Sequence, residues 1–167
     1  MNTTTTVRLL KAHQEDFEWY PTTDEIIDDL WKDIFTSIVK KNDVSSRYCE
    51  RTKMQVVKDS WYHNQEKYRA MHVKSFLDIG TGDGRILNKK SVSYNGDEYQ
   101  VKIDSRMGVE KATQLANNLI AQGVWMLGRD YMNMTLIDKS FDVVFSNPPY
   151  SIFEPWCEKI VREVDST

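Results

Sequence analysis

The stretch Ser75–Gly84, SFLDIGTGDG, constrains this chain most strongly, because three glycines stand at alternate positions directly after a short apolar run. Glycine adopts positive φ at little cost and lets a ligand approach the backbone where a Cβ would otherwise stand. The apolar run predicts a buried strand, which places the glycines in the loop at its carboxyl end. Ligands of open α/β sheets bind at that end of the strands, so the sequence predicts a ligand site at this loop.

Helical and strand patterns alternate around the loop. Thr22 and Glu25 have the spacing of a capping box, and apolar residues then recur at helical spacing to Ile38, which predicts a helix ending near Lys41. Residues 44–72 lack Gly and Pro and predict one or two further helices. The elements expected next are strands at 73–79, 105–110, 124–130 and 141–150, helices at 85–90, 111–123 and 153–164, and a hairpin turn at Asn95-Gly96. This alternation predicts an α/β fold with a parallel sheet covered on both faces.

The net charge of −3 argues against a globally basic nucleic-acid binder. However, residues 40–74 carry nine Lys and Arg against four Asp and Glu, together with Tyr48, Trp61, Tyr62 and Tyr68. Cations mixed with aromatic faces suit phosphates and unstacked bases, and the basic residues expected to bind nucleic acid are Arg47, Arg51 and Lys53. The alternative is a solvated helix whose aromatic side chains face the core.

No apolar stretch is long enough for a signal peptide or a membrane span, so a cytoplasmic protein is expected. Cys49 and Cys157 stand far apart, outside any Cys/His cluster. They are expected to be free thiols, and no metal site is expected.

The acidic residues around the glycines narrow the choice of ligand. The loop has the pattern D-x-G-x-G-x-G, with Asp78 before the glycines and Asp83 among them, which differs from the dinucleotide fingerprint G-x-G-x-x-G. Two carboxylates would repel a pyrophosphate. They suit a ligand with an ammonium or sulfonium group, such as S-adenosylmethionine (SAM).

The segment FLDIGTGDG resembles the first motif of the class I SAM-dependent methyltransferases. The resemblance implies that Gly80, Gly82 and Gly84 wrap the methionine end of SAM and that Asp78 positions it. It also implies that Glu110, which ends the second strand, holds the ribose hydroxyls, and that Asp130, which follows the third, meets the adenine amine. The alternative is a tight strand-to-helix turn with solvated acids.

The segment FDVVFSNPPY supplies a candidate reaction. An exocyclic amine is a poor nucleophile because its lone pair is delocalised, and hydrogen-bond acceptors localise that lone pair. The Asn147 side-chain oxygen and the Pro148 carbonyl can accept these bonds, Pro148 and Pro149 stiffen the backbone, and the Tyr150 ring can stack on a planar substrate. The alternative is a turn that only ends a strand. NPPY resembles the fourth motif of the amino-methyltransferases.

That group includes DNA adenine-N6, ribosomal RNA guanine-N2 and release-factor glutamine methyltransferases. The segment FEWYPTTDEIIDDL resembles the aromatic-Thr-Pro element that precedes the SAM loop in restriction-modification adenine methyltransferases, although its order here is Y-P-T-T. With the basic segment, this similarity favours adenine in DNA as the substrate. The base would be flipped into the pocket and stacked on Tyr150 before in-line methyl transfer, which depends on positioning more than on a general base.

The resemblance divides the chain into an N-terminal helical region with a basic insert, residues 1–72, and a SAM-binding Rossmann-like core, residues 73–167. Members of the family continue for three more strands, which the 17 residues after Tyr150 cannot hold. An open sheet edge is therefore expected, completed by a second copy or a partner protein. Two alternatives remain open: a non-catalytic, truncated relative such as a phage anti-defence protein that binds DNA, SAM or a defence protein, and an amino-methyltransferase acting on RNA or protein.

Overall fold

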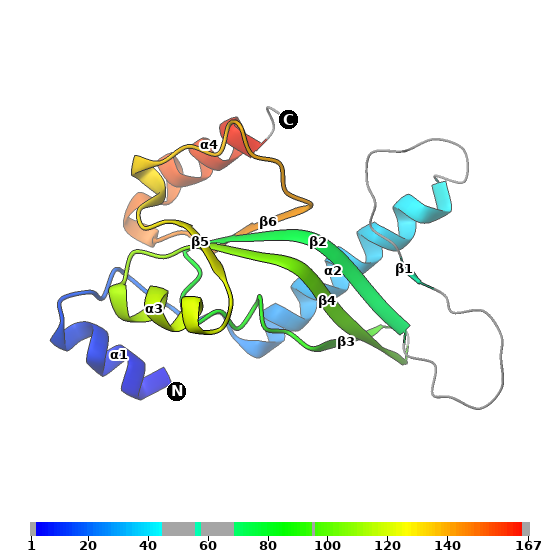
Figure 1. Ribbon diagram of the computed structural model, residues 1–167, viewed down its shortest axis with the longest axis horizontal. Helices are drawn as coiled ribbons and strands as arrows, with labels where there is room; N and C mark the ends of the chain where they lie inside the picture. The colour runs from blue at the N-terminus through cyan, green and yellow to red at the C-terminus, as the bar shows by residue number, and fades with distance from the viewer. Residues whose placement is uncertain (1–2, 45–55, 58–68, 95, 165–167) are drawn as a thin grey trace.

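The computed structural model describes residues 3–44, 56–57, 69–94 and 96–164. Within these ranges the chain forms four α-helices, six strands and two 3-10 turns (Figure 1). In order they are α1 (Thr3–Ala12), α2 (Asp24–Val44), β1 (Val56–Val57), β2 (Arg69–Ile79), β3 (Ser91–Tyr94), β4 (Asp97–Val109), α3 (Thr113–Ala121), β5 (Trp125–Gly128), η1 (Tyr131–Asn133), β6 (Val143–Ser146), η2 (Tyr150–Ile152) and α4 (Phe153–Val164).

The strands form one mixed sheet, so the predicted α/β class is confirmed. Four strands lie parallel in the order β5-β4-β2-β6. The sheet is not parallel throughout, because β1 and β3 pair antiparallel with the amino-terminal parts of β2 and β4. The pairing of β3 with β4 is that of the predicted hairpin, whereas β1 was not predicted. The chain steps outward from β2 to β4 and β5 and then returns to β6 on the other side of β2. A ligand site is expected where the strand order reverses in this way.

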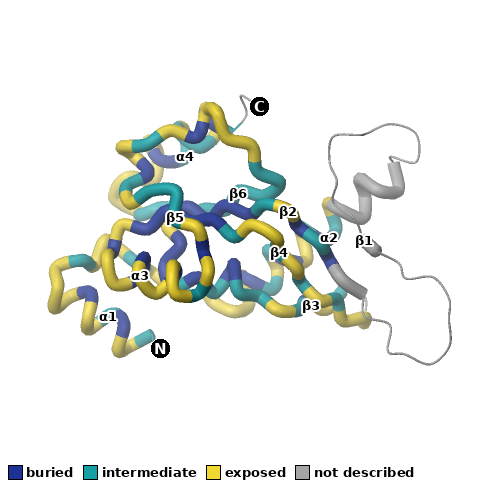
Figure 2. Tube along the Cα trace, viewed as in Figure 1, coloured by how far each residue is buried: buried dark blue, intermediate teal, exposed yellow. Residues whose placement is uncertain are grey.

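Apolar side chains on both faces of the sheet hold the helices in place. On one face, Trp31 and Phe35 of α2 pack with Phe76 of β2 and with Leu119 of α3. On the other face, Leu77 of β2 belongs to a second cluster, which also includes Trp156 of α4. Figure 1 shows α4 on the opposite side of the sheet from α2, and Figure 2 shows the buried residues concentrated in the strands between them. The expected cover on both faces is therefore confirmed.

Tyr94 of β3 pairs antiparallel with Asp97 of β4, as the hairpin predicted at Asn95-Gly96 requires, while Asn95 itself lies outside the described residues. The separate strand predicted at 105–110 is absent, because β4 runs without a break from Asp97 to Val109. Polar residues in its middle have partners on neighbouring elements. Asp104 lies 2.6 Å from His72 Nε2, and Arg106 donates to the Gln122 carbonyl at 2.6 Å. Paired in this way, these polar residues lie within one continuous strand.

Two predictions for the region before the glycine loop need correction. In the segment 44–72, which was predicted to be helical, Val44 ends α2, whereas Val56–Val57 and the residues from Arg69 onward are strands. The rest of this segment lies outside the described residues. β2 begins at Arg69, so the boundary placed at residue 72 runs through this strand. The proposed nucleic-acid residues Arg47, Arg51 and Lys53 lie outside the described residues.

The two amino-terminal helices differ in how well the sequence predicts them. α2 is confirmed, although its cap is Thr23, whose Oγ1 accepts from the Ile26 N–H at 3.4 Å, rather than Thr22. α1 was not predicted, because Thr3–Ala12 is rich in Thr and only Thr6 and Leu10 of it are buried. The predicted helices after β4 and β6 are confirmed as α3 and α4.

The strand that precedes Asn147 has one free edge in the described structure. β6 pairs with β2, and among the described residues no strand pairs with its other edge. This agrees with the open edge expected from the sequence, while completion of the sheet by another chain stays a prediction. In the ranges that the structure describes, no helix has the length and apolar character needed to cross a membrane.

Candidate functional site

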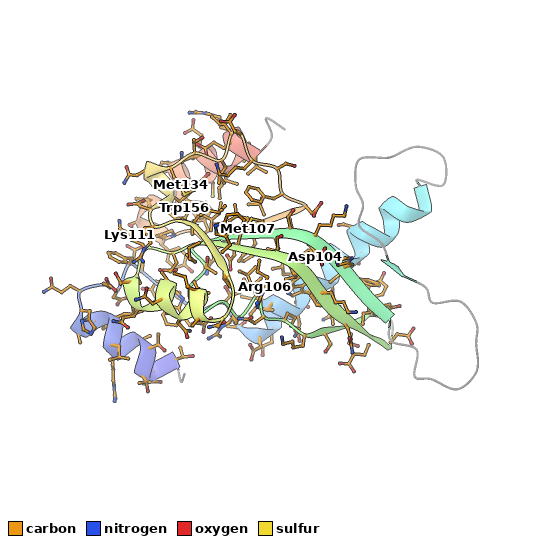
Figure 3. All side chains as sticks on the ribbon, viewed as in Figure 1. Asp104, Arg106, Met107, Lys111, Met134 and Trp156 are labelled. Atoms are coloured by element: carbon orange, nitrogen blue, oxygen red, sulfur yellow. The ribbon has the colours of Figure 1, made fainter. Side chains whose placement is uncertain are left out.

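The predicted site residues meet at the carboxyl ends of the parallel strands. Asp78 lies at the end of β2, Glu110 directly follows β4, Asp130 follows β5 and Asn147 directly follows β6. All four line one cavity of about 450 Å³, a volume typical of small-molecule sites. Figure 3 shows Lys111 and Trp156, two further lining residues, at this end of the sheet, whereas Asp104 lies farther back along β4.

Asp78 is the most unusual group in the cavity. It is only 1% exposed, and its Oδ1 has no hydrogen-bond partner. Burial, with smaller contributions from Glu110 and Asp83, raises the pKa of Asp78 to about 8. An unpartnered buried carboxyl is costly, and a cationic or N–H-bearing ligand in the cavity would satisfy it. The site therefore fits the ammonium and sulfonium groups expected from the sequence.

Glu110 ties the glycine loop to the start of α3. Its Oε2 accepts from the Gly82 N–H and its Oε1 from the Ala112 N–H, both at 2.8 Å. Burial raises the pKa of Glu110, and these two backbone donors partly oppose the rise. Each oxygen keeps a second lone pair that a ligand hydroxyl can use. The structure thus gives Glu110 a role in holding the loop, which the sequence did not reveal.

The three loop glycines have different surroundings, although all have positive φ. A Cβ on Gly80 would lie 3.7 Å from the Asn147 carbonyl, and Gly80 lines the cavity. A Cβ on Gly84 would lie 2.6 Å from Leu119 Cδ2, and one on Gly82 would lie 2.2 Å from Trp19 Nε1. Gly80 is thus the loop glycine that borders the cavity, while the other two permit close packing.

The short helix predicted after the loop is absent, because residues 85–88 form only turns and residues 89–90 neither helix nor strand. The Asn88 N–H donates to the Gly84 carbonyl at 3.0 Å, which closes a single turn. Only six residues separate Gly84 from the start of β3 at Ser91. That length is too short to offset the cost of starting a helix. The chain therefore passes from the glycine loop to β3 through a single turn.

Asp130 lies at the far side of the cavity and is already paired. Its Oδ1 accepts from the Met132 N–H at 3.1 Å, and its Oδ2 lies 3.1 Å from Lys111 Nζ. The hydrogen bond from Lys111 lowers the pKa of Asp130, and the Met132 N–H adds to the effect. Asp130 is therefore a carboxylate that can accept a further hydrogen bond.

Residues 15–22, here called the strap, cross the cavity and line it. Glu15 Oε2 accepts from the Thr113 N–H at 2.8 Å, at the start of α3. Glu18 Oε2 accepts from the Ser151 N–H at 3.0 Å, and Arg85 Nη1 donates to the Thr22 carbonyl at 3.1 Å. The strap contains the first three residues of the Y-P-T-T element, so the sequence signal for it was present. Its contacts with residues 63 to 133 positions away were not predictable.

The NPPY residues divide between the cavity and its surroundings. Asn147 and Pro149 line the cavity, whereas Pro148 and Tyr150 are not among its lining residues. The Tyr150 ring is 73% exposed and lies 5.6 Å from the ring centroid of Tyr20, in the strap. An exposed face therefore remains for the stacking expected of Tyr150.

Replacing Gly82 tests whether the strap rests on the glycine loop. We expect Gly82→Ala to displace Trp19, because the added Cβ would overlap the indole. The fluorescence emission of Trp19, identified as the part that is lost in Trp19→Phe, is therefore expected to change. Gly96→Ala is the matched control, since Gly96 also has positive φ but a Cβ there meets nothing within 4 Å. Equal emission changes in the two variants would contradict this packing.

Acidic groups dominate the cavity. Seven carboxylate residues line it, against three cationic residues. The three cations are engaged: Lys111 with Asp130, Arg85 with Asp83, and Arg129 with the Lys111 carbonyl at 2.9 Å. This balance favours a cationic ligand over a phosphate. In the described ranges, no three His, Cys, Asp or Glu residues form a metal-binding group.

Comparisons with protein-family models, curated proteins and solved structures find no match to this chain.

Proposed function

We propose that the chain is a SAM-dependent amino-methyltransferase with a Rossmann-like core that acts on the N6 amine of adenine in DNA. One observation carries the proposal: the buried, unpartnered carboxyl of Asp78 and the amide of Asn147 open into the same cavity. A site for a cation thus adjoins a hydrogen-bond acceptor for an amine. The strand order β5-β4-β2-β6, with both groups on adjacent strands at the reversal, supports it.

SAM, when bound, supplies a methyl group activated by its positively charged sulfur. Asp78 would hold the cationic methionine end, and the backbone at Gly80 leaves room beside it. Glu110 and Asp130 would accept hydrogen bonds from the ribose and from the adenine amine of SAM. Each of these roles uses a residue that already lines the cavity.

The chain's own residues would prepare the substrate amine. The Asn147 Oδ1 and the Pro148 carbonyl accept hydrogen bonds from its two N–H groups and so localise the lone pair on nitrogen. The exposed ring of Tyr150 stacks on the base. Holding the base beside Asn147, at the cavity that would hold SAM, would contribute by proximity and orientation. The proton that the amine loses on methylation would pass to solvent, so the step depends on positioning more than on a general base.

The proposed partners rest on different regions. DNA is proposed from the basic segment that contains Arg47, Arg51 and Lys53, together with the exposed aromatic residues near Asn147. A second copy or a partner protein is proposed from the free edge of β6 in the described structure. A strand added there would extend the sheet beside the substrate site.

Tritium transfer from methyl-labelled SAM tests the function. DNA, RNA and a protein extract are offered separately, and the expected product is N6-methyladenine in DNA. Label in RNA or protein instead would support the alternative amino-methyltransferase. SAM binding without transfer to any substrate would favour the non-catalytic relative.

A further inference from the structure

We infer that the backbone carbonyl of Tyr20 is a positioning group, which holds the Asn147 amide so that its oxygen faces the substrate amine. The inference rests on the proposed function. Asn147 Nδ2 donates to the Tyr20 carbonyl at 3.2 Å, across 127 positions of sequence. Both residues line the cavity.

This contact decides which end of the Asn147 amide is available. An amide has a donor end and an acceptor end, and the two fit different partners. A carbonyl can only accept, so turning the amide over would bring two oxygens together. Among the described residues, Asn147 Oδ1 has no partner, which leaves it free to accept from a substrate. The site therefore favours a ligand group that donates a hydrogen bond, such as an exocyclic amine.

The chain on both sides of Tyr20 is anchored, so its carbonyl has a fixed direction. Before it, Glu18 accepts from the Ser151 N–H, which also lowers the pKa of Glu18. After it, the Thr22 carbonyl accepts from Arg85. Glu18 has a φ of +56°, a conformation that a residue other than glycine adopts only when its surroundings hold it there.

Pro21 and the Tyr20 ring fit the same role. A residue before proline is restricted to extended conformations, which limits how the Tyr20 carbonyl can turn. The ring of Tyr20 is 60% exposed and packs at 49° to Tyr150, so it makes its contact separately from the carbonyl. The order Y-P in this chain thus places a rigid acceptor beside Asn147.

A change to the backbone tests the acceptor directly. Replacing Pro21 with lactic acid turns the Tyr20–Pro21 peptide bond into an ester, whose carbonyl is a weaker acceptor. Pro21→Ala is the matched reference, because it also lacks the ring but keeps an amide at this link. Each change is made in the wild-type chain and in Asn147→Asp, which places a carboxylate against the carbonyl.

Two measurements are made on these four proteins. The side-chain ¹⁵N–¹H₂ resonance of Asn147, assigned by its loss in Asn147→Asp, is expected to shift when the ester replaces the Pro21→Ala amide. In methyl transfer, the ester is expected to lower kcat about fivefold with Asn147 present. With Asn147→Asp it is expected to raise kcat, because a weaker acceptor repels a carboxylate less.

Opposite signs of the ester effect in the two backgrounds would support the inference, since a general loss of folding lowers both rates. An unchanged Asn147 resonance, or the same sign in both backgrounds, would overturn it while leaving the proposed function standing. A shifted resonance in a wild-type protein that transfers no methyl group would establish the hydrogen bond. It would also contradict both the proposed function and the substrate-facing role of Asn147.

Discussion

Asn147→Ala is expected to lower methyl transfer to adenine by about 100-fold or more while changing the dissociation constant of SAM less than about twofold. The reason is positional. Asn147 lies at the end of β6 and contacts the strap through Tyr20, whereas the unpartnered carboxyl expected to hold SAM is Asp78, at the end of β2. Removing the Asn147 amide therefore removes an acceptor for the amine and leaves the carboxylates of the cofactor region in place.

Single-turnover rates and SAM titrations on the same preparations separate these two effects. Asn117→Ala is the matched control, because Asn117 is an exposed residue of α3 and lines no described cavity. Parallel losses of SAM affinity and turnover in Asn147→Ala would mean that Asn147 contributes to the cofactor site or to folding. The role proposed for it would then be wrong.

The second large effect concerns the pH dependence of stability. The pKa of Asp78 is about 8 in the folded chain because of burial, against 3.8 for an ordinary Asp. Between these values the folded state keeps a proton that the unfolded state has released. The free energy of unfolding therefore falls as pH rises from about 4 to about 8, by roughly 1.4 kcal/mol per pH unit from this group alone.

Asp78→Asn removes this contribution while keeping nearly the same shape. We expect the free energy of unfolding of Asp78→Asn to rise relative to that of the wild type as pH increases from 5 to 8. Above pH 8 the difference between the two proteins is expected to level off. Denaturant unfolding at pH 5, 6, 7, 8 and 9 measures it. A difference that stays constant over this range would show that Asp78 is ionised in the folded protein at low pH, contrary to its burial.

The sequence predicted the positions of the polar groups better than it predicted their partners. Asp78, Glu110, Asp130 and Asn147 were each expected at the end of a strand, and each lies there. This worked because the hydrophobic pattern of a buried parallel strand is local, and because parallel strands bring their carboxyl ends to one edge. α3 and α4 were predictable for the same local reason.

The errors have physical causes that a local pattern does not contain. β4 continues through Asp104 and Arg106 because partners on β2 and after α3 satisfy them, and these partners are distant in sequence. The strap closes over the cavity through hydrogen bonds to three separate elements. Likewise, the sequence could not show that Gly82 packs beneath Trp19.

These partners change the meaning of two predicted residues. Gly82 was expected to make room for the methionine end of SAM, yet in the structure its open side faces the Trp19 indole. Glu110 was expected to hold a ribose, and it also fixes the loop through the Gly82 N–H. The strap and the loop therefore act as one unit around the proposed cofactor.

Calorimetric titration with SAM at pH 6.5 and pH 8.5 tests the central claim, a cation site at Asp78, most directly. A bound cation favours the ionised carboxylate, so binding at pH 6.5 must release the Asp78 proton. The wild type is expected to bind SAM at both pH values. From pH 6.5 to pH 8.5 its affinity is expected to rise about tenfold or more beyond any change seen in Asp78→Asn, whose pH dependence reports the titration of SAM itself. Buffers of different ionisation enthalpy should report close to one proton released per SAM at pH 6.5 in the wild type, and fewer in the variant. No binding at millimolar SAM, or the same pH dependence and proton release in both proteins, would contradict the account.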